Sequence, residues 1–495
     1  MGWQNARKIA RAPMTLPEFS PTALAEPPSA GCSGLVCGHR DSLYLAISRC
    51  LDGGAGLCFV VDDEKRIVGR VTLDSVRNAI RKGELSSGTP IGRSVALMPE
   101  PVNSREDFAG VATPMLDARG RLVDVIVDQG RAAVPLSKPD MTSAELEALL
   151  DAFVSTWISS RGPQIGALET GFSDLVGTRE AIAVSSGTAA LHLALLSLGI
   201  GPGDEVVVPD LTFAATINAV IHSGATPVIA DIDPASWGLC PDALADAITA
   251  RTKAVILVHL YGRPVLSDTF RCAWKHGLAI VEDCAEAQGA EVGGSPVGSI
   301  GEVGCFSLFA NKLISTGEGG MCTTQRVSLA ANIRELRDHG MDASRPFWHE
   351  RVGYNYRMTN LQAAIGTVQL KRFGEIVTKR NRVAALYRKH LADIPGIHFP
   401  SPPESGSRAV NWLATVLVPP EKRAELIEAA LAERIELRGF FHPLSAMPPY
   451  RAYARDCPNS ARIAQSGLCL PTSGNEDDHV AEKIARIFQE VIGSS

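Results

Sequence analysis

The sequence predicts an α/β protein whose largest part, residues 142–370, is built on a mostly parallel sheet. Helices and short apolar strands alternate there, which is typical of such sheets. At 495 residues the chain is longer than one hydrophobic core usually serves, so more than one domain is expected. We therefore predict a large α/β domain, a smaller α+β domain over residues 371–495, and a separate α+β domain before residue 131.

The chain before residue 142 divides into three segments. Residues 1–33 are rich in Pro, Ala and Ser without a period, which predicts a loosely ordered leader. Within residues 34–130 the order helix, strand, turn, strand occurs twice, around GLCFVVDDEKRIVGRVT and around LDARGRLVDVIV, which predicts a module with its own core. Residues 131–141 contain two prolines and predict a linker. A chain beginning near Ser137 is therefore expected to keep any activity that the later domains have.

The repeated unit resembles a CBS pair, a small regulatory module that often binds adenine nucleotides between its halves. In that family a Thr and an Asp three residues later commonly hold the ribose. Thr72 is present here, but Ser75 stands at the Asp position and Asp74 lies one place early. We therefore expect weak or no nucleotide binding. A structural or dimerising appendage without a ligand is an equal alternative to a ligand sensor.

The remainder of the chain begins with a helix predicted from Thr142 to about Trp157, because Thr142 and Glu145 have capping-box spacing. The strands expected after it are AIAVS, EVVVPD, TPVIADI, AVILVHLYG, LAIVED and CFSLF. In the smaller C-terminal domain, a strand is expected around WLATVLV and helices around 421–433 and 479–492.

Composition excludes several classes of function. Lys and Arg number 48 against 54 Asp and Glu, a net charge of -6 that argues against a nucleic-acid surface. Apolar runs are interrupted before a membrane-spanning length, and no signal-peptide pattern opens the chain. The 11 Cys show neither pairing nor metal spacing, so we expect buried thiols in a cytoplasmic protein without a metal.

Two ordered motifs predict a pyridoxal phosphate site. A buried strand, residues 278–281, leads to Asp283 at its carboxyl end, where open α/β sheets place ligands. Thirty residues on, Ser307 and Lys312 precede a glycine-rich turn. Asp283 is expected to keep the cofactor's pyridinium nitrogen protonated, so that the ring accepts an electron pair, and Lys312 to hold the aldehyde as a Schiff base.

Further candidates surround this pair. The turn SSGT starts a helix at Gly187, where free backbone amides of Gly187 and Thr188 favour a phosphate, with the hydroxyl of Ser307 beside them. Phe213 offers a flat face for the cofactor ring. Glu286 lies one helical turn beyond Asp283 and is expected near the phenolic oxygen.

Seven ordered motifs resemble the DegT/StrS sugar-nucleotide aminotransferases: SSGTAAL, PDLTFAAT, VHLYG, EDCAEAQGA, FSLFANKLISTGEGGM, GYNYRMTNLQAAIG and ELRGFFHPL. They span residue 163 to the C-terminus. The resemblance implies a fold type I aminotransferase, a homodimer with composite active sites, and transfer of an amino group from L-glutamate to a nucleotide-linked keto sugar.

The resemblance assigns the same cofactor roles to the residues named above. It adds Asn355 as the residue that reaches the phosphate in the other subunit, and it places Arg438 and His442 near the sugar nucleotide. Glu318, in the glycine-rich turn, is expected with them as a substrate-binding residue. Leu437 stands where the family usually has Thr.

The predicted function is a ping-pong transamination in which Lys312 moves the proton and a 4-keto-6-deoxy sugar nucleotide becomes the 4-amino-4,6-dideoxy product, perosamine-like, for surface polysaccharide or glycoconjugate synthesis. One alternative is a sugar 3-dehydratase on the same fold, which in related enzymes has His instead of the lysine. A second alternative is a ligand-sensing regulator that uses a degenerate transferase domain as a scaffold. It predicts losses among the site residues, and none is lost.

Overall fold

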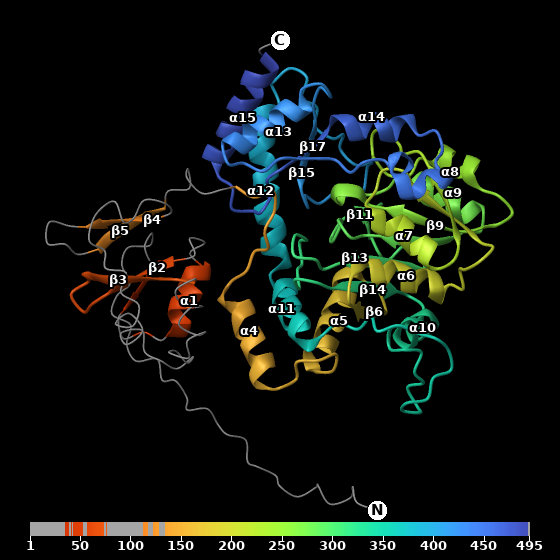
Figure 1. The fold of residues 1–495 in the computed structure, drawn as a ribbon, viewed down its shortest axis with the longest axis horizontal. Coiled ribbons are helices and arrows are strands. Elements are labelled where there is room, and N and C mark those ends of the chain that lie inside the picture. Colours follow the sequence, from red (N-terminus) through yellow and green to blue (C-terminus); the bar gives the residue numbers. More distant parts are fainter. Residues whose placement is uncertain are drawn as a thin grey trace, which may run out of the picture. The chain divides into compact units, whose positions relative to one another are not determined.

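The protein divides at Asp128 into two compact units, which we describe separately (Figure 1). The computed structural model describes residues 35–38, 41, 43–52, 57–73, 76, 112–116, 122–127 and 134–493. The predicted leader lies outside the described residues. So do Asp74, Ser75 and most of the helix that we expect over DSVRNAIRKG, after the first pair of strands in the repeat.

The N-terminal unit contains a three-stranded sheet and a hairpin. Its elements are β1 (Val36–Gly38), α1 (Leu43–Asp52), β2 (Leu57–Val61), β3 (Ile67–Thr72), β4 (Ala112–Leu116) and β5 (Leu122–Val127). Strand β2 pairs in parallel with β1 and antiparallel with β3, and β4 pairs with β5. Cys37, Cys50 and Cys58 belong to the small core between α1 and the sheet. Both strand pairs of the predicted repeat are therefore present among the described residues.

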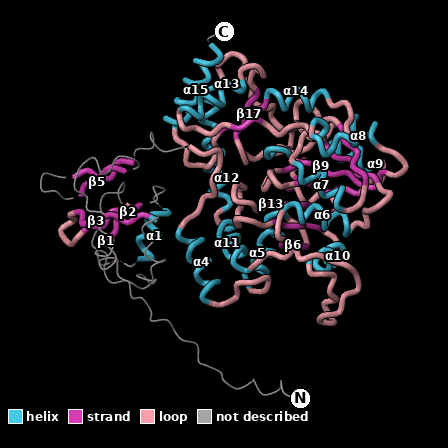
Figure 2. Tube along the Cα trace, in the orientation of Figure 1, coloured by secondary structure: helices cyan, strands magenta, loops and turns pink. Residues whose placement is uncertain are grey.

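The C-terminal unit is built around a seven-stranded mixed sheet in the order β6-β14-β13-β10-β9-β7-β8. Figure 2 shows its strands enclosed by helices. The strands are β6 (Glu180–Val184), β7 (Glu205–Pro209), β8 (Thr226–Ala230), β9 (Thr252–Val258), β10 (Ala279–Asp283), β13 (Val303–Ser307) and β14 (Gly320–Thr324). Only β14 runs antiparallel to its neighbours in this sheet. The predicted mostly parallel sheet is confirmed.

Both faces of this sheet are buried, which explains the near-continuous apolar strands. Along β6, Ile182 and Val184 face one hydrophobic core while Ala181 and Ala183 face the other. The covering helices are α5 (Pro163–Val176), α6 (Gly187–Ser197), α7 (Ala214–His222), α8 (Pro241–Ala247), α9 (Ser267–Lys275), α10 (Val327–Arg337) and α11 (Asn360–Lys371). Since all six parallel strands end at one edge, the residues that follow them meet there.

The smaller C-terminal portion packs helices on a three-stranded antiparallel sheet with the order β15-β17-β16. Its elements are α12 (Phe373–Leu391), β15 (Ala414–Leu417), α13 (Arg423–Ala432), β16 (Arg438–Gly439), α14 (Pro458–Ser466), β17 (Gly467–Leu470) and α15 (Asp478–Gly493). It has its own core. Its first helix follows Arg372, close to the predicted start of this domain at residue 371.

Helix α4 (Ser143–Val154) has the predicted capping box: the Thr142 side chain caps the helix, and Glu145 bonds back to the Thr142 amide. The helix ends three residues before the predicted Trp157. Thr156 has a left-handed φ of 65°, which a continuing helix does not allow, and the Ser155 hydroxyl bonds to the carbonyl of Ala152.

Residues 134–142, which we call the strap, lie along the C-terminal unit. Val134 forms a β-bridge with Ile435. The side chain of Leu136 is buried, and its carbonyl oxygen accepts a hydrogen bond from the Thr472 amide. The Ser137 hydroxyl donates to the carbonyl of Asn311, directly before Lys312. We predicted a linker over residues 131–141, but its described part is packed against elements more than 170 residues away in sequence.

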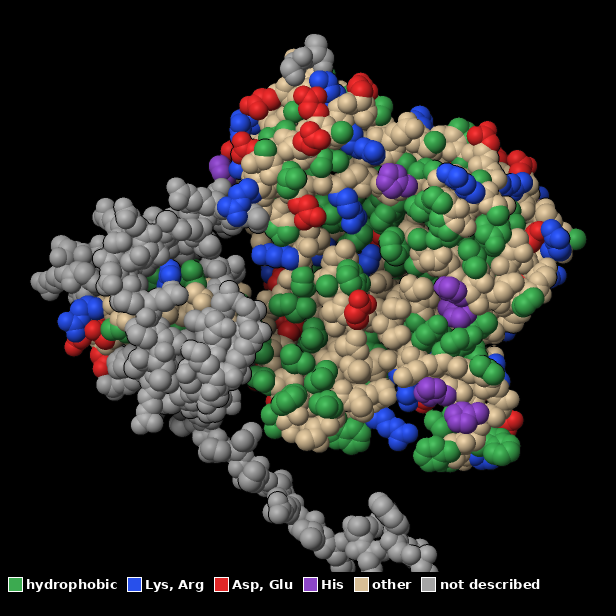
Figure 3. All heavy atoms as spheres, viewed as in Figure 1, with side chains coloured by type: hydrophobic (Ala, Val, Ile, Leu, Met, Phe, Trp, Pro, Cys, Tyr) green, Lys and Arg blue, Asp and Glu red, His purple; other side chains and the backbone are tan. Residues whose placement is uncertain are grey.

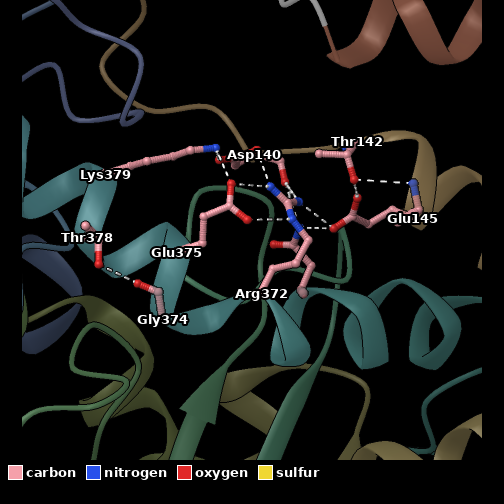
Figure 4. A network of polar contacts seen from close by, with 10 residues as sticks. Asp140, Thr142, Glu145, Arg372, Gly374, Glu375, Thr378 and Lys379 are labelled. Carbon is pink, nitrogen blue, oxygen red and sulfur yellow. Dashed lines mark hydrogen bonds and ion pairs between the residues drawn. The ribbon is translucent and has the colours of Figure 1, made fainter.

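A network of ion pairs fixes the far end of the strap (Figure 4). Asp140 lies 2.9 Å from Arg372 and 2.8 Å from Lys379, and Glu145 lies 2.8 Å from Arg372. Burial alone would raise the pKa of Asp140, but hydrogen bonds from Lys379 and Arg372 outweigh it and lower that pKa. Arg372 is 14% exposed on its side chain, so these pairs are better shielded from solvent than ordinary surface pairs.

The strap leads to a prediction about truncation. A chain beginning at Gln129 retains the strap and should keep turnover within about tenfold of the full chain. A chain beginning at Thr142 loses the buried Leu136 and leaves Arg372 without Asp140, so its free energy of unfolding should fall by about 2–4 kcal/mol. Urea denaturation of both chains measures this. Equal midpoints would contradict a stabilising role for the strap.

Hydrophobic side chains gather on the surface over α4 and over the loop after α10 (Figure 3). Exposed members near α4 are Phe153, Val154, Trp157 and Ile158, and those in the loop are Phe347, Trp348 and Val352. None of the helices in the described ranges is both long and apolar enough to cross a bilayer.

Candidate active site

A pocket of about 420 Å³ opens at the carboxyl ends of the parallel strands. Nine of the predicted site residues line it: Gly187, Thr188, Phe213, Asp283, Glu286, Ser307, Glu318, Lys312 and Arg438. They come from five separate motifs of the sequence. The fold therefore brings together most of the predicted site.

Asp283 ends β10 at the base of the pocket and is 5% exposed. One carboxylate oxygen accepts a hydrogen bond of 2.8 Å from the Thr216 hydroxyl, and the other accepts one of 3.2 Å from the Ala285 amide. Burial raises the pKa of Asp283, while the Thr216 hydrogen bond and the charge of Lys312 oppose the rise. The side chain is thus held rigidly in one direction.

Lys312 lies between a carboxylate and an aromatic face. Its Nζ is 3.6 Å from Oε1 of Glu286 and 3.7 Å from the centre of the Trp412 ring. Burial lowers the pKa of Lys312 and raises that of Glu286, although each residue's charge opposes the shift of the other. Burial outweighs the pairing on both sides, which favours the neutral, nucleophilic amine.

The start of α6 forms an anion-binding turn. Ser186 caps the helix by accepting a hydrogen bond from the Ala189 amide. Gly187 and Thr188 are the first two residues of the helix, so their amides have no helical partners, and both residues line the pocket. A Cβ on Gly187 would lie 3.0 Å from Cβ of Ser307, so the absence of a side chain lets the helix start approach Ser307 closely. This cradle fits the phosphate of pyridoxal phosphate.

Phe213 lies at an exposed part of the pocket lining, whereas Asn355 and His442 lie outside the lining. Phe213 lines the pocket with 58% of its surface exposed, and its ring centre is 5.6 Å from that of Phe441. Asn355 is exposed, bonds to Arg357, and is not among the residues lining this chain's own pocket. His442 is likewise exposed and outside the lining.

Sequence reasoning missed three residues that shape the site. Trp412 lies under Lys312, Thr216 orients Asp283, and the amide of Tyr261 donates a 2.9 Å hydrogen bond to Glu286. Thr216 and Tyr261 lie inside the quoted motifs PDLTFAAT and VHLYG, which therefore carried a usable signal. Trp412 was read as part of a strand, and nothing local marks it as a pocket residue.

One buried group near the site resembles a set of metal ligands: His259, Glu282 and Cys284. Glu282, however, already accepts backbone amides from Gly298, Ile300 and Gly301 at 2.8 to 3.0 Å, and its Oε2 lies 3.2 Å from His259. These bonds give the carboxylate a structural role in the loop that follows.

Residues 139–489 match the DegT/DnrJ/EryC1/StrS aminotransferase family. The GDP-perosamine synthase of Caulobacter vibrioides is 42% identical over 368 residues, which cover 72% of this chain and 98% of that protein. The dTDP-4-dehydro-2,3,6-trideoxy-D-glucose 4-aminotransferase of Saccharopolyspora spinosa is 33% identical over 379 residues, which cover 72% of this chain and 97% of that protein.

A solved structure agrees with the fold. The aminotransferase TlmJ from Streptoalloteichus hindustanus superposes with a TM-score of 0.69 at 30% identity, covering 72% of this chain and 98% of that one. The match confirms the predicted aminotransferase fold for the C-terminal unit. The pocket contains a lysine, two carboxylates and a helix N-terminus suited to a phosphate. From the family match and this pocket, the chain belongs to the DegT/DnrJ/EryC1/StrS aminotransferase family and is a pyridoxal phosphate-dependent aminotransferase.

Proposed function

We propose that the protein transfers the amino group of L-glutamate to C4 of a nucleotide-linked 4-keto-6-deoxyhexose, giving a 4-amino-4,6-dideoxy sugar nucleotide of the perosamine type. The observation that carries this proposal is the buried arrangement of Lys312 between Glu286 and Trp412, with Asp283 in the same pocket. The identity of 42% to a GDP-perosamine synthase supports the choice of sugar.

When bound, pyridoxal phosphate supplies an aldehyde for covalent capture of the amine and a ring that accepts electrons. Lys312 is the residue that attaches it, because its amine is buried and its pKa is lowered. With the cofactor bound, Nζ of Lys312 would take the α-proton of the donor amino acid in the first half-reaction and deliver a proton to the carbon that gains the amine in the second. Glu286, 3.6 Å away, holds the amine in place for both steps.

Asp283, which lines the same pocket, would keep a proton on the ring nitrogen. Gly187, Thr188 and Ser307 hold the phosphate at the start of α6. Phe213 covers the face of the ring. Each of these roles was predicted from the sequence, and the shared pocket supports them together.

Arg438 is the group in the pocket that best suits an anionic substrate. Its Nε and Nη2 are buried and form no hydrogen bond within the described structure, and its Cζ lies 5.9 Å from the centre of the Trp412 ring. A buried guanidinium without a carboxylate partner is costly. A carboxylate of glutamate or the diphosphate of the sugar nucleotide would relieve that cost, with Glu318 at the rim binding sugar hydroxyls.

The alternatives fit less well. A sugar 3-dehydratase of the kind considered above would replace the lysine, whereas Lys312 is present and well placed. A regulator on a degenerate scaffold would lose site residues, whereas nine of them line one pocket.

A homodimer with shared sites remains our proposal for the assembly. Asn355 is exposed and does not line its own chain's pocket, as expected of a residue that serves a second subunit. The exposed apolar residues over α4 and after α10 offer a surface for that subunit. The CBS-like character of residues 34–130 and a cytoplasmic location also stay predictions.

The function is tested by incubating the purified protein with ¹⁵N-glutamate and a panel of keto-sugar nucleotides that differ in nucleotide and in keto position. We expect a ¹⁵N-labelled product, detected by mass, from the GDP-linked 4-keto-6-deoxy sugar, and at least tenfold less from 3-keto isomers. Labelling only of 3-keto sugars, or deoxygenation without nitrogen gain, would overturn the proposal.

A further inference from the structure

We propose that Tyr261 is a positioning residue that joins the two sides of the pocket: its amide fixes Glu286 beside Lys312, and its hydroxyl holds the segment that carries Arg438. This inference rests on the proposed function, because it treats this pocket as the site of amino transfer. Tyr261 is 2% exposed, and although it lies within the motif VHLYG, the sequence assigned it no role.

The backbone of Tyr261 is the first indication. It lies in a short 3-10 turn (Leu260–Gly262) with φ 53° and ψ 29°, a left-handed conformation that is strained for a bulky residue. Such outliers persist only where the surroundings enforce them, and they concentrate at functional sites. The next residue, Gly262, is also left-handed, and a Cβ there would lie 2.1 Å from the carbonyl oxygen of Val410.

The strained conformation determines what the residue can reach, because φ sets the angle between the amide and the side chain. The Tyr261 amide donates to Oε2 of Glu286 at 2.9 Å. The other oxygen of that carboxylate, Oε1, lies 3.6 Å from Nζ of Lys312. Glu286 is thereby fixed at one oxygen and presented to the lysine with the other.

The turn itself is anchored to the end of β10. The amide of His259 donates to the carbonyl of Asp283 at 3.0 Å, and Nδ1 of His259 accepts from the Val265 amide at 3.2 Å. Nε2 of the same ring lies 3.2 Å from Glu282. His259 therefore ties both ends of the turn to the strand that delivers Asp283.

The side chain of Tyr261 extends to the C-terminal part of the pocket. Its hydroxyl accepts a 3.0 Å hydrogen bond from the Phe441 amide. Its ring is nearly parallel to that of Trp412, at 8° and 6.1 Å between centres, and lies 5.4 Å from that of Phe441. Arg438 lies 5.6 Å from the Phe441 ring and 5.9 Å from the Trp412 ring. Tyr261 thus binds Glu286 on one side of the pocket. On the other side it contacts Phe441 and Trp412, the two aromatic residues beside Arg438.

Tyr261→Phe tests this assignment, since it keeps the turn and the ring but leaves the Phe441 amide without its acceptor. Tyr450→Phe is the matched control: Tyr450 is also buried, and its hydroxyl donates to Asn218 at 2.8 Å, away from the pocket lining. We expect amide hydrogen exchange in the segment 438–443 to rise about tenfold in Tyr261→Phe and to stay unchanged in Tyr450→Phe.

In kinetics, Tyr261→Phe should raise KM for the substrate bound at Arg438 about tenfold, with kcat within threefold and an unchanged cofactor dissociation constant. If Tyr261 were merely structural, the substitution would weaken cofactor binding as well as raise KM, or it would match Tyr450→Phe in every measurement. Either result would overturn the assignment. Absence of amino transfer in the unmodified protein would refute the proposed function alone, because the exchange measurement tests Tyr261 without turnover.

Discussion

Lys312→Ala is expected to abolish amino transfer, with turnover falling more than a hundredfold, and to remove the visible absorption of the lysine-bound cofactor. Lys312 is the lysine among the pocket-lining residues, so no other described amine is in place to attach the cofactor or move the proton. A hundredfold corresponds to about 2.7 kcal/mol in the barrier. Absorption spectra and single-turnover kinetics with glutamate measure both effects.

Lys312→Arg is the matched control, because it keeps a long basic side chain between Glu286 and Trp412 but cannot supply a neutral amine at ordinary pH. It should be as inactive as the alanine variant while retaining more stability. Turnover above one hundredth of the unmodified protein in either variant would refute the assignment of Lys312.

Asp283→Asn should leave a folded protein that binds the cofactor but turns over about a hundredfold more slowly. The amide keeps the shape of the carboxylate and its contact with Thr216 but cannot hold a proton on the ring nitrogen. Because burial raises the pKa of Asp283, the unmodified protein should itself lose this negative charge as pH falls, so the difference in turnover between the two proteins should be largest at neutral and alkaline pH and smaller in acid. Cofactor titration and kcat measure the two parts.

Asp210→Asn provides the comparison. Asp210 is also buried and follows β7, which lies two strands from β10 in the sheet. It accepts hydrogen bonds from the amide and hydroxyl of Ser445, but it does not line the pocket. It should lower stability without changing kcat by more than a few fold. If both variants slowed turnover equally, Asp283 would have no special role at the ring.

Most of the sheet could be predicted because buried parallel strands are apolar on both faces, as in β7 and β9. Strand β14 was missed. Its sequence, GMCTT, follows a glycine run that reads as a turn, and it becomes a strand because β13 and β6 pair with it on both sides. Tertiary pairing here overrides a weak local preference.

The site divides in the same way. Asp283, Lys312 and the start of α6 lie in compact motifs whose chemistry is local, so the sequence predicts them. Trp412 is 100 residues from Lys312 and stands in an ordinary apolar run, so its contact with the lysine depends on how the smaller domain packs. The strained turn at Tyr261 is also invisible in sequence, because a tyrosine there gives no sign of a left-handed backbone.

The strap has a consequence for how the chain matures during synthesis. Its partners Glu436 and Ser473 lie 300 and 335 residues later in the chain than the strap residues that they bind. Translation proceeds from the N-terminus, so the strap leaves the ribosome long before those partners exist. The N-terminal unit therefore has time to fold on a free tether, and the enzyme unit can complete its fold only when nearly all of the chain has been released.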